Sequence, residues 1–202
     1  MVFHLNTHSC FSLLEGLPTP VELAEEAARQ EMPVLGLTDH RMLTGAVEFA
    51  GACRKHGIQP VIGLEVDLAW GRDRERISLL AAGERGWASL CRISSREMLG
   101  GEDQPVSLEV LNDHREDLIA VCTALNDSSG KRWEQVREFF RDRLYLGLPS
   151  PHYTLVELGA RLRLPVVAYP PVFYLRPEES RIQSLVSAIR RNATLKTLPA
   201  NA

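Results

Sequence analysis

The sequence predicts an α/β fold in which parallel strands close, or nearly close, into a barrel. Two observations support this fold class. Short apolar runs alternate with helical stretches along the chain, and about seven such runs fit within 202 residues. This alternation is typical of consecutive strand–helix–strand units around a parallel sheet. An open, doubly wound sheet is the alternative; the sequence has neither a Gly-x-Gly-x-x-Gly fingerprint nor a P-loop.

The predicted strands are short apolar runs bounded by turn or helix signals. They span residues 2–8, 33–38, 59–68, 76–82, 116–124, 143–148 and 165–171.

Helices are predicted between these strands, and several carry recognisable ends. Thr19 and Pro20 form the start of the first helix, because a capping Thr followed by Pro at the first helical position is a common start signal. The second helix closes on Lys-His-Gly, which is typical of a C-terminus. The predicted helices span residues 19–31, 42–57, 85–99, 131–142, 152–164 and 177–191, and residues 100–116 form a looser connection.

Composition indicates one globular domain. Hydrophobic residues make up 45% and charged residues 24% of the chain, and the net charge of −3 gives no basic surface that would indicate direct nucleic-acid binding. The four cysteines (Cys10, Cys53, Cys91, Cys122) form no Cys-x-x-Cys pair, which favours reduced thiols in a cytosolic protein. Neither a signal peptide nor a membrane span is apparent, so we expect a soluble, cytoplasmic protein.

Metal-ligand residue types gather where the first three strands end. In barrels of this kind, catalytic and ligand-binding residues lie at the C-terminal ends of the strands. Alternation along a strand also places Asn6 and His8 on the same face as His4. Imidazole and carboxylate groups of this kind hold zinc or manganese in hydrolytic sites. The candidates are His4, His8, Glu15, Asp39, His40, Glu65 and Asp67. Each also has an ordinary structural interpretation, such as a cap for Asp39 or a solvated strand end for Glu65.

Three stretches resemble a known family: "HLNTHSCFSLLEG", "LGLTDHRMLTGAVEFAGACRKHGIQPVIGLEV" and "RISLLAAGERGWASLCRISS". They are similar to the N-terminal PHP (polymerase and histidinol phosphatase) domain of bacterial DNA polymerase III alpha subunits, including the error-prone type. The resemblance implies a distorted TIM-like (β/α)7 barrel. Intact members of the family hold two or three divalent ions and hydrolyse phosphate esters. Some polymerase PHP domains are 3′–5′ exonucleases, whereas others act as scaffolds.

The resemblance assigns metal-ligand positions residue by residue. His8, Glu15, His40 and Glu65 match ligands, and His4, Asp39 and Cys122 are secondary candidates. Other ligand positions carry residues that do not ligate metals well: Asn6, Arg76, Pro171, Phe173 and Gln183. The fifth-strand cysteine of the family corresponds to Ala124. An arginine among these ligand positions, here Arg76, would repel a metal ion. Its guanidinium could instead pair with Glu65 or Glu15 and substitute for the lost cation.

The resemblance therefore implies a degenerate PHP domain that supports DNA replication or translesion synthesis structurally. It would span residues 1–195, with residues 196–202 starting a linker towards an absent polymerase region. The expected partners are the polymerase domain of the same parent chain, a proofreading subunit, and DNA indirectly, without a membrane. The expected cofactor is none, or one residual zinc or manganese ion.

Two alternatives stay open. The first is an active metal-dependent phosphoesterase or 3′–5′ exonuclease that uses His8, Glu15, His40 and Glu65, completed by His4 or Cys122. The second is a free-standing phosphatase of the histidinol phosphate type.

Overall fold

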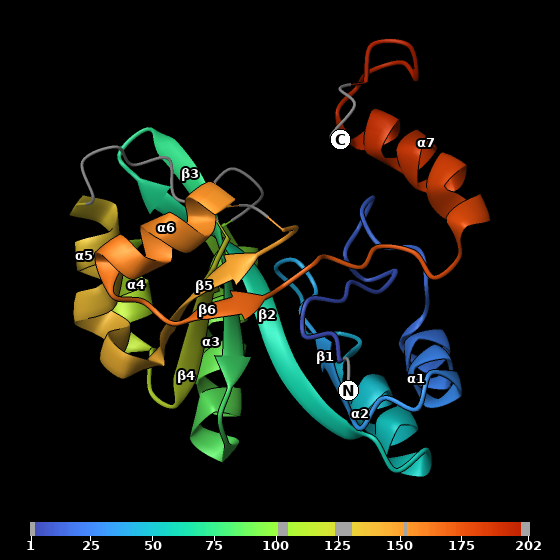
Figure 1. The fold of residues 1–202 in the computed structure, drawn as a ribbon, viewed down its shortest axis with the longest axis horizontal. Coiled ribbons are helices and arrows are strands. Elements are labelled where there is room, and N and C mark those ends of the chain that lie inside the picture. The colour runs from blue at the N-terminus through green and yellow to red at the C-terminus, as the bar shows by residue number, and fades with distance from the viewer. Residues whose placement is uncertain (1–2, 101–104, 124–130, 152, 199–202) are drawn as a thin grey trace. The chain divides into compact units, whose positions relative to one another are not determined.

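The computed structural model describes residues 3–100, 105–123, 131–151 and 153–198 (Figure 1). The chain forms two compact units, Met1–Val61 with Pro171–Ala202 and Ile62–Pro170. The predicted domain of residues 1–195 contains the described parts of both units up to that residue.

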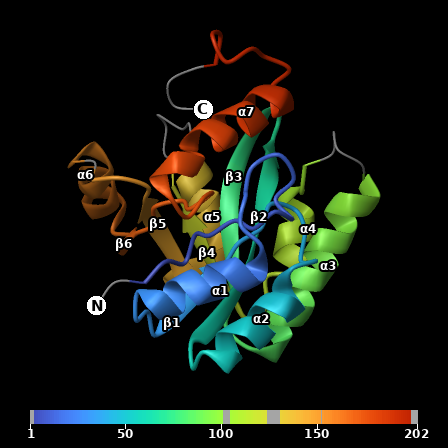
Figure 2. The same ribbon diagram turned by 90° about the vertical axis from the view of Figure 1, so that its right-hand side faces the viewer.

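The first unit is built from α1, β1, α2, the start of β2, and a C-terminal helix. Helices α1 and α2 lie side by side in Figure 1 and Figure 2. The elements are α1 (Pro20–Arg29), β1 (Val34–Leu37), α2 (Ala46–Lys55), β2 (Gln59–Trp70), the short 3-10 helix η2 (Pro177–Glu179) and α7 (Ser180–Arg190).

The start of α1 follows the sequence prediction closely. The Thr19 side chain accepts a hydrogen bond from the Glu22 backbone N–H, and the Glu22 carboxylate accepts one from the Thr19 backbone. These reciprocal bonds satisfy donors that a helix start leaves open. Leu23 and Ala27 of α1 and Phe49 of α2 are buried, so the two helices enclose a small apolar core.

In the described part of the predicted strand at 2–8, residues 3–8 form two isolated bridges, His4 with Leu35 and Thr7 with Val172. The chain here runs against β1 at very short range: a Cβ on Gly36 would lie 2.5 Å from the Leu5 carbonyl oxygen. Glycine at position 36 is therefore required by the close approach of two backbones. The prediction of a continuous first strand is wrong, because pairing is interrupted between the two bridges.

The second unit consists of most of β2 and the strands that follow it, with helices packed on them. Helix α3 contacts β3, α5 contacts β4 and β5, and α6 contacts β5. The elements are β3 (Asp73–Ala81), α3 (Glu84–Gly100), α4 (Leu108–Asp113), β4 (Leu118–Cys122), α5 (Lys131–Phe140), the 3-10 helix η1 (Arg141–Arg143), β5 (Leu144–Leu148), α6 (Tyr153–Leu162) and β6 (Val166–Ala168).

The sheet order is β1-β2-β3-β4-β5-β6, but its strands are not all parallel. Strands β4, β5 and β6 run parallel, whereas β2 pairs with β3 and β3 with β4 in antiparallel fashion. A two-residue turn, with Gly71 at φ 62°, joins β2 directly to β3. The prediction of a fully parallel sheet is wrong for this part, because the connection is a hairpin and leaves no room for a crossover helix.

The connection at residues 100–116 also differs from the prediction. Its described part contains α4, whose first turn is capped by the Ser107 side chain accepting from the Val110 backbone N–H. None of the helices in the described part of the chain is both long enough and apolar enough to span a bilayer.

Candidate metal centre

The candidate ligands fall into two groups, one in each unit. The first unit holds Asn6, His8, Glu15, Asp39 and His40, and the second unit holds Glu65, Asp67, Arg76 and Cys122.

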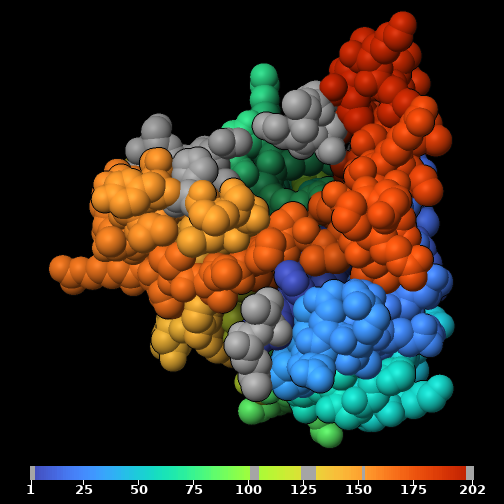
Figure 3. Space-filling view, turned by 45° about the vertical axis from the view of Figure 1, so that its right-hand side comes forward, coloured from blue at the N-terminus to red at the C-terminus, as the bar shows by residue number. Residues whose placement is uncertain are grey.

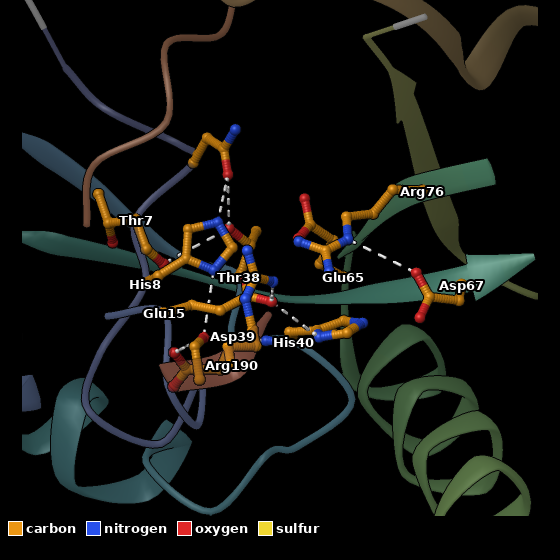
Figure 4. A network of polar contacts seen from close by, with 12 residues as sticks. Thr7, His8, Glu15, Thr38, Asp39, His40, Glu65, Asp67, Arg76 and Arg190 are labelled. Carbon is orange, nitrogen blue, oxygen red and sulfur yellow. Dashed lines mark hydrogen bonds and ion pairs between the residues drawn. The ribbon is translucent and has the colours of Figure 1, made fainter. Parts of the chain in front are cut away.

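His8 is fully buried, and both of its ring nitrogens face protein groups (Figure 4). Nε2 lies 2.9 Å from the Asn6 amide oxygen, and Nδ1 lies 3.2 Å from the Ser12 hydroxyl. The Phe173 ring stacks on the imidazole with 4.6 Å between the ring centroids. Asn6 and Phe173, which were predicted to stand at lost ligand positions, therefore both contact His8, which was predicted as a retained ligand.

Asp39 organises the loop that follows His8. Its carboxylate accepts from the Ser9 backbone N–H and hydroxyl, both at 2.6 Å, and from the Ser12 hydroxyl at 2.7 Å. Burial raises the pKa of the Asp39 carboxyl above its ordinary value, although the hydrogen bonds from Ser9 and Ser12 oppose the rise. The Ser12 hydroxyl also accepts from the His40 backbone N–H at 3.0 Å. Asp39 thus holds the loop in shape through Ser9 and Ser12.

Glu15 lies at the other end of this loop, and its side chain is 3% exposed. One carboxylate oxygen, Oε1, forms an ion pair with Arg190 and lies 3.4 Å from His40 Nδ1 (Figure 4). The Gln183 amide donates to the Glu15 backbone carbonyl at 3.4 Å. Arg190 and Gln183 both come from α7, so the C-terminal helix supplies two of the partners of Glu15.

His4 does not join His8. It lines a separate cavity of about 210 Å³ together with apolar residues of α1 and the Val172–Leu175 segment. Pro171 is exposed and offers no ligand atom. Among the described residues, the structure therefore gathers His8, Glu15, Asp39 and His40 in the first unit and leaves His4 apart.

In the second unit, Arg76 pairs with two carboxylates of the neighbouring strand. Its Nη1 lies 3.1 Å from Glu65 Oε2, and its Nε lies 3.5 Å from Asp67 Oδ1 (Figure 4). Asp67 and Arg76 stand directly opposite each other in the β2–β3 ladder. Opposite residues of an antiparallel pair point to the same face, which brings the guanidinium to these acids.

Cys122 lies on the other face of this sheet. It is opposite Ile77, which is itself opposite Val66, whereas Glu65 is opposite Ser78. Because side chains alternate along a strand, the row of Cys122 and the row of Glu65 point in opposite directions. Burial raises the pKa of the Cys122 thiol, and a neutral thiol is a poor metal ligand. The family position at Ala124 lies outside the described residues.

As arranged, the two acids that were expected as ligands are already paired with positive charges. Glu15 and Glu65 each face a guanidinium, and His8 contacts Asn6 and Ser12. A metal would have to displace fixed positive charges that lie on the same carboxylate oxygens.

Sequence reasoning missed three groups that shape this site: Ser9, Ser12 and Arg190. The two serines belong to the "THSCFS" stretch and could have been recognised as partners for a buried acid. Arg190 lies 175 residues from Glu15, and a basic residue in the last turn of a helix gives no indication of such a contact.

Residues 4–146 match the protein family described as the PHP domain. The DNA polymerase III subunit alpha of Thermus aquaticus is 30% identical over 228 residues, a match that covers 95% of this chain and 19% of the relative. The error-prone DNA polymerase of Symbiobacterium thermophilum is also 30% identical over 228 residues, covering 93% of this chain and 20% of the relative. The chain thus spans about a fifth of the length of these relatives.

Two solved structures share the fold. An amidohydrolase from Chromobacterium violaceum has a TM-score of 0.62 at 17% identity, over 91% of this chain and 96% of that protein. A two-domain protein from Bacteroides vulgatus that contains a predicted PHP-like metal-dependent phosphoesterase has a TM-score of 0.58 at 11% identity, over 86% of this chain and 52% of that protein. At these identities the likeness shows the fold alone, and it confirms the predicted α/β fold of the TIM-like barrel type.

Proposed function

Because the chain belongs to the PHP domain family, we propose that it acts as the structural PHP domain of a DNA polymerase III alpha-type polymerase, replicative or error-prone. The chain is homologous to the N-terminal domain of such subunits at 24–30% identity. In this role the domain works without a resident metal ion, in the cytoplasm, and supports DNA synthesis carried out elsewhere in a longer polypeptide.

The observation that carries this proposal is the pair of arginines on the two acids at ligand positions. A phosphoesterase centre needs metal ions to activate water and to bind the phosphoryl oxygens. In this chain Arg190 faces Glu15 and Arg76 faces Glu65 and Asp67, so the same acids are neutralised by side chains of the protein. Neutralised in this way, the acids stabilise the fold and do not need a metal.

The proposed partner is the polymerase region of the same polypeptide, and α7 offers a surface for it. Ile182, Leu185 and Ile189 lie one or two turns apart on α7 and are 49–59% exposed. Figure 3 shows α7 and the residues after it, in orange-red and red, at the surface of the molecule. An exposed apolar stripe of this kind is typical of a helix that packs against another protein surface. A proofreading subunit and indirect contact with DNA stay predictions from the resemblance.

The test is an activity and metal assay on the 202-residue chain. After dialysis against zinc or manganese, we expect far less than one ion per chain by elemental analysis. We also expect no hydrolysis of bis-p-nitrophenyl phosphate or of a labelled single-stranded oligonucleotide. Turnover that is lost in His40→Ala and kept in His56→Ala, a change at an exposed histidine after α2, would instead support the phosphoesterase alternative.

A further inference from the structure

In the folded chain, the buried Glu15 carboxylate needs a positive charge beside it. Its carboxylate is 3% exposed, and an ionised carboxylate is costly to bury unless it is paired. Its Oε1 lies against both the Arg190 guanidinium and His40 Nδ1. Of these two partners, arginine is permanently charged, whereas histidine is cationic only when protonated.

The helix that supplies Arg190 is attached through a polar face. On α7 the buried residues are Gln183, Ser187 and Ala188. The Gln183 amide donates to the Glu15 carbonyl at 3.4 Å and to the Ser187 hydroxyl at 3.1 Å. A helix that buries mainly small and polar groups gains little hydrophobic stabilisation, so its position depends strongly on specific polar contacts.

From these observations we infer that Arg190 takes the place of a metal ion at Glu15 and thereby fastens α7 to the Ser9–Gly16 loop. The inference rests on the proposed function, in which the site has no resident metal. It assigns to Arg190 a positioning role: the guanidinium neutralises the buried acid and holds the last helix where its apolar stripe faces outward.

The same geometry indicates which ligand atoms would become available if Arg190 were replaced. His8 and Glu15 offer ligand atoms within 4.8 Å of each other, and His40 Nδ1 lies 3.4 Å from Glu15. Imidazole and carboxylate groups are ligand types that zinc takes, and Glu15 is the acid that each of these histidines approaches. Removal of the guanidinium should therefore lower the stability of the fold and at the same time create affinity for a divalent ion.

The experiment compares thermal unfolding of the 202-residue chain and three variants (Arg190→Gln, Glu15→Gln and the double variant), each with and without zinc chloride. We expect Arg190→Gln to lower the melting temperature by about 5 °C and zinc to recover most of that loss. Zinc should leave the parent chain unchanged. Arg181→Gln, at an exposed position on α7, is the matched control and should melt like the parent.

The double variant keeps the test decisive if Arg190→Gln alone unfolds. Because it removes the buried charge together with its partner, it should melt above Arg190→Gln and should not respond to zinc. The inference is overturned if Arg190→Gln melts like the parent, or if the double variant is no more stable than Arg190→Gln. A parent chain that binds zinc and hydrolyses phosphate esters would instead overturn the proposed function.

Discussion

Arg190 and Arg76 each pair with an acid that the sequence predicted as a metal ligand, Glu15 and Glu65, yet they connect very different parts of the chain. Arg190 joins the last helix to a loop near the N-terminus, 175 residues away in sequence. Arg76 joins two strands that are already paired, and Asp67 is its direct neighbour across the ladder. Glu15 is also more deeply buried than Glu65, with side chains 3% and 11% exposed. An arginine–carboxylate pair can therefore either connect distant segments or act within a local strand pair.

The largest effect is expected from a change in the loop that carries Glu15. A Cβ at Gly16 would lie 2.2 Å from the Ser9 carbonyl oxygen and 2.7 Å from that of His8. Backbone atoms cannot give way cheaply, so Gly16→Ala should lower the free energy of unfolding by about 3 kcal/mol. Urea denaturation would measure the change.

Gly51→Ala is the matched control for this loop variant. Gly51 lies within α2, and a Cβ there would meet nothing within 4 Å. Alanine should stabilise that helix by about 0.5–1 kcal/mol. If both glycine variants gave the same small change in the free energy of unfolding, the Ser9–Gly16 loop would not be a rigid attachment site for Arg190.

Arg76→Ala is expected to have a smaller effect than the loss of Arg190. The acids that Arg76 faces are less buried than Glu15, because the side chains of Glu65 and Asp67 are 11% and 25% exposed and that of Glu15 is 3% exposed, so water can partly solvate them once the arginine is gone. We expect a loss of about 1 kcal/mol in the free energy of unfolding, against about 2 kcal/mol for Arg190→Gln. Arg72→Ala, in the exposed β2–β3 turn, should change stability by less than about 0.5 kcal/mol. A larger loss at Arg76 than at Arg190 would reverse the comparison.

The difference between the two arginines also shows what the sequence could reveal. Arg76 was identifiable because it lies in a predicted strand at a position where the family has a ligand, and its pairing with Glu65 was one of two predicted partners. Arg190 was not identifiable, because its contact with Glu15 depends on the tertiary path of the whole chain. Gln183 was recognised only as a substituted ligand position, whereas its amide contact with Glu15 required the structure.

Predictions from local sequence patterns were wrong for the first strand, for the β2–β3 connection and for helix α4. His4 and His8 were expected on one face, but pairing is interrupted between the bridges at His4 and Thr7, and the alternation of an extended strand is not kept. The hairpin between β2 and β3 was missed although only seven residues separate the two predicted strands, too few for a parallel crossover. Helix α4 was missed although Ser107 is a good N-cap before a short helical stretch.

Asp39 offers a pH test of how the Glu15 loop is held. Because burial raises the pKa of Asp39 in the folded chain, the folded state retains this proton at pH values where the unfolded state has lost it. The contribution of Asp39 to stability is therefore fully present below its unfolded pKa, and it is lost as pH rises through the folded pKa.

Asp39→Asn removes this contribution. The variant should gain stability relative to the parent as pH rises from about 3 to about 6, measured by urea denaturation at each pH. A variant that instead loses stability relative to the parent over this range would mean that the Ser9 and Ser12 hydrogen bonds outweigh burial. In that case the loop would be held by an ionised Asp39.

The smallest effect on stability is expected on the outward face of α7. Replacing Ile182, Leu185 and Ile189 together with Gln keeps good helix formers on the helix and leaves Gln183 and Arg190 untouched. The free energy of unfolding should stay within about 0.5 kcal/mol of the parent, because these side chains are about half exposed. Binding of the dye ANS should fall, since the stripe is an exposed apolar patch, while Arg181→Gln should leave it unchanged. A triple variant that unfolds would mean that α7 is held by these apolar side chains, and Arg190 would then no longer be its main attachment.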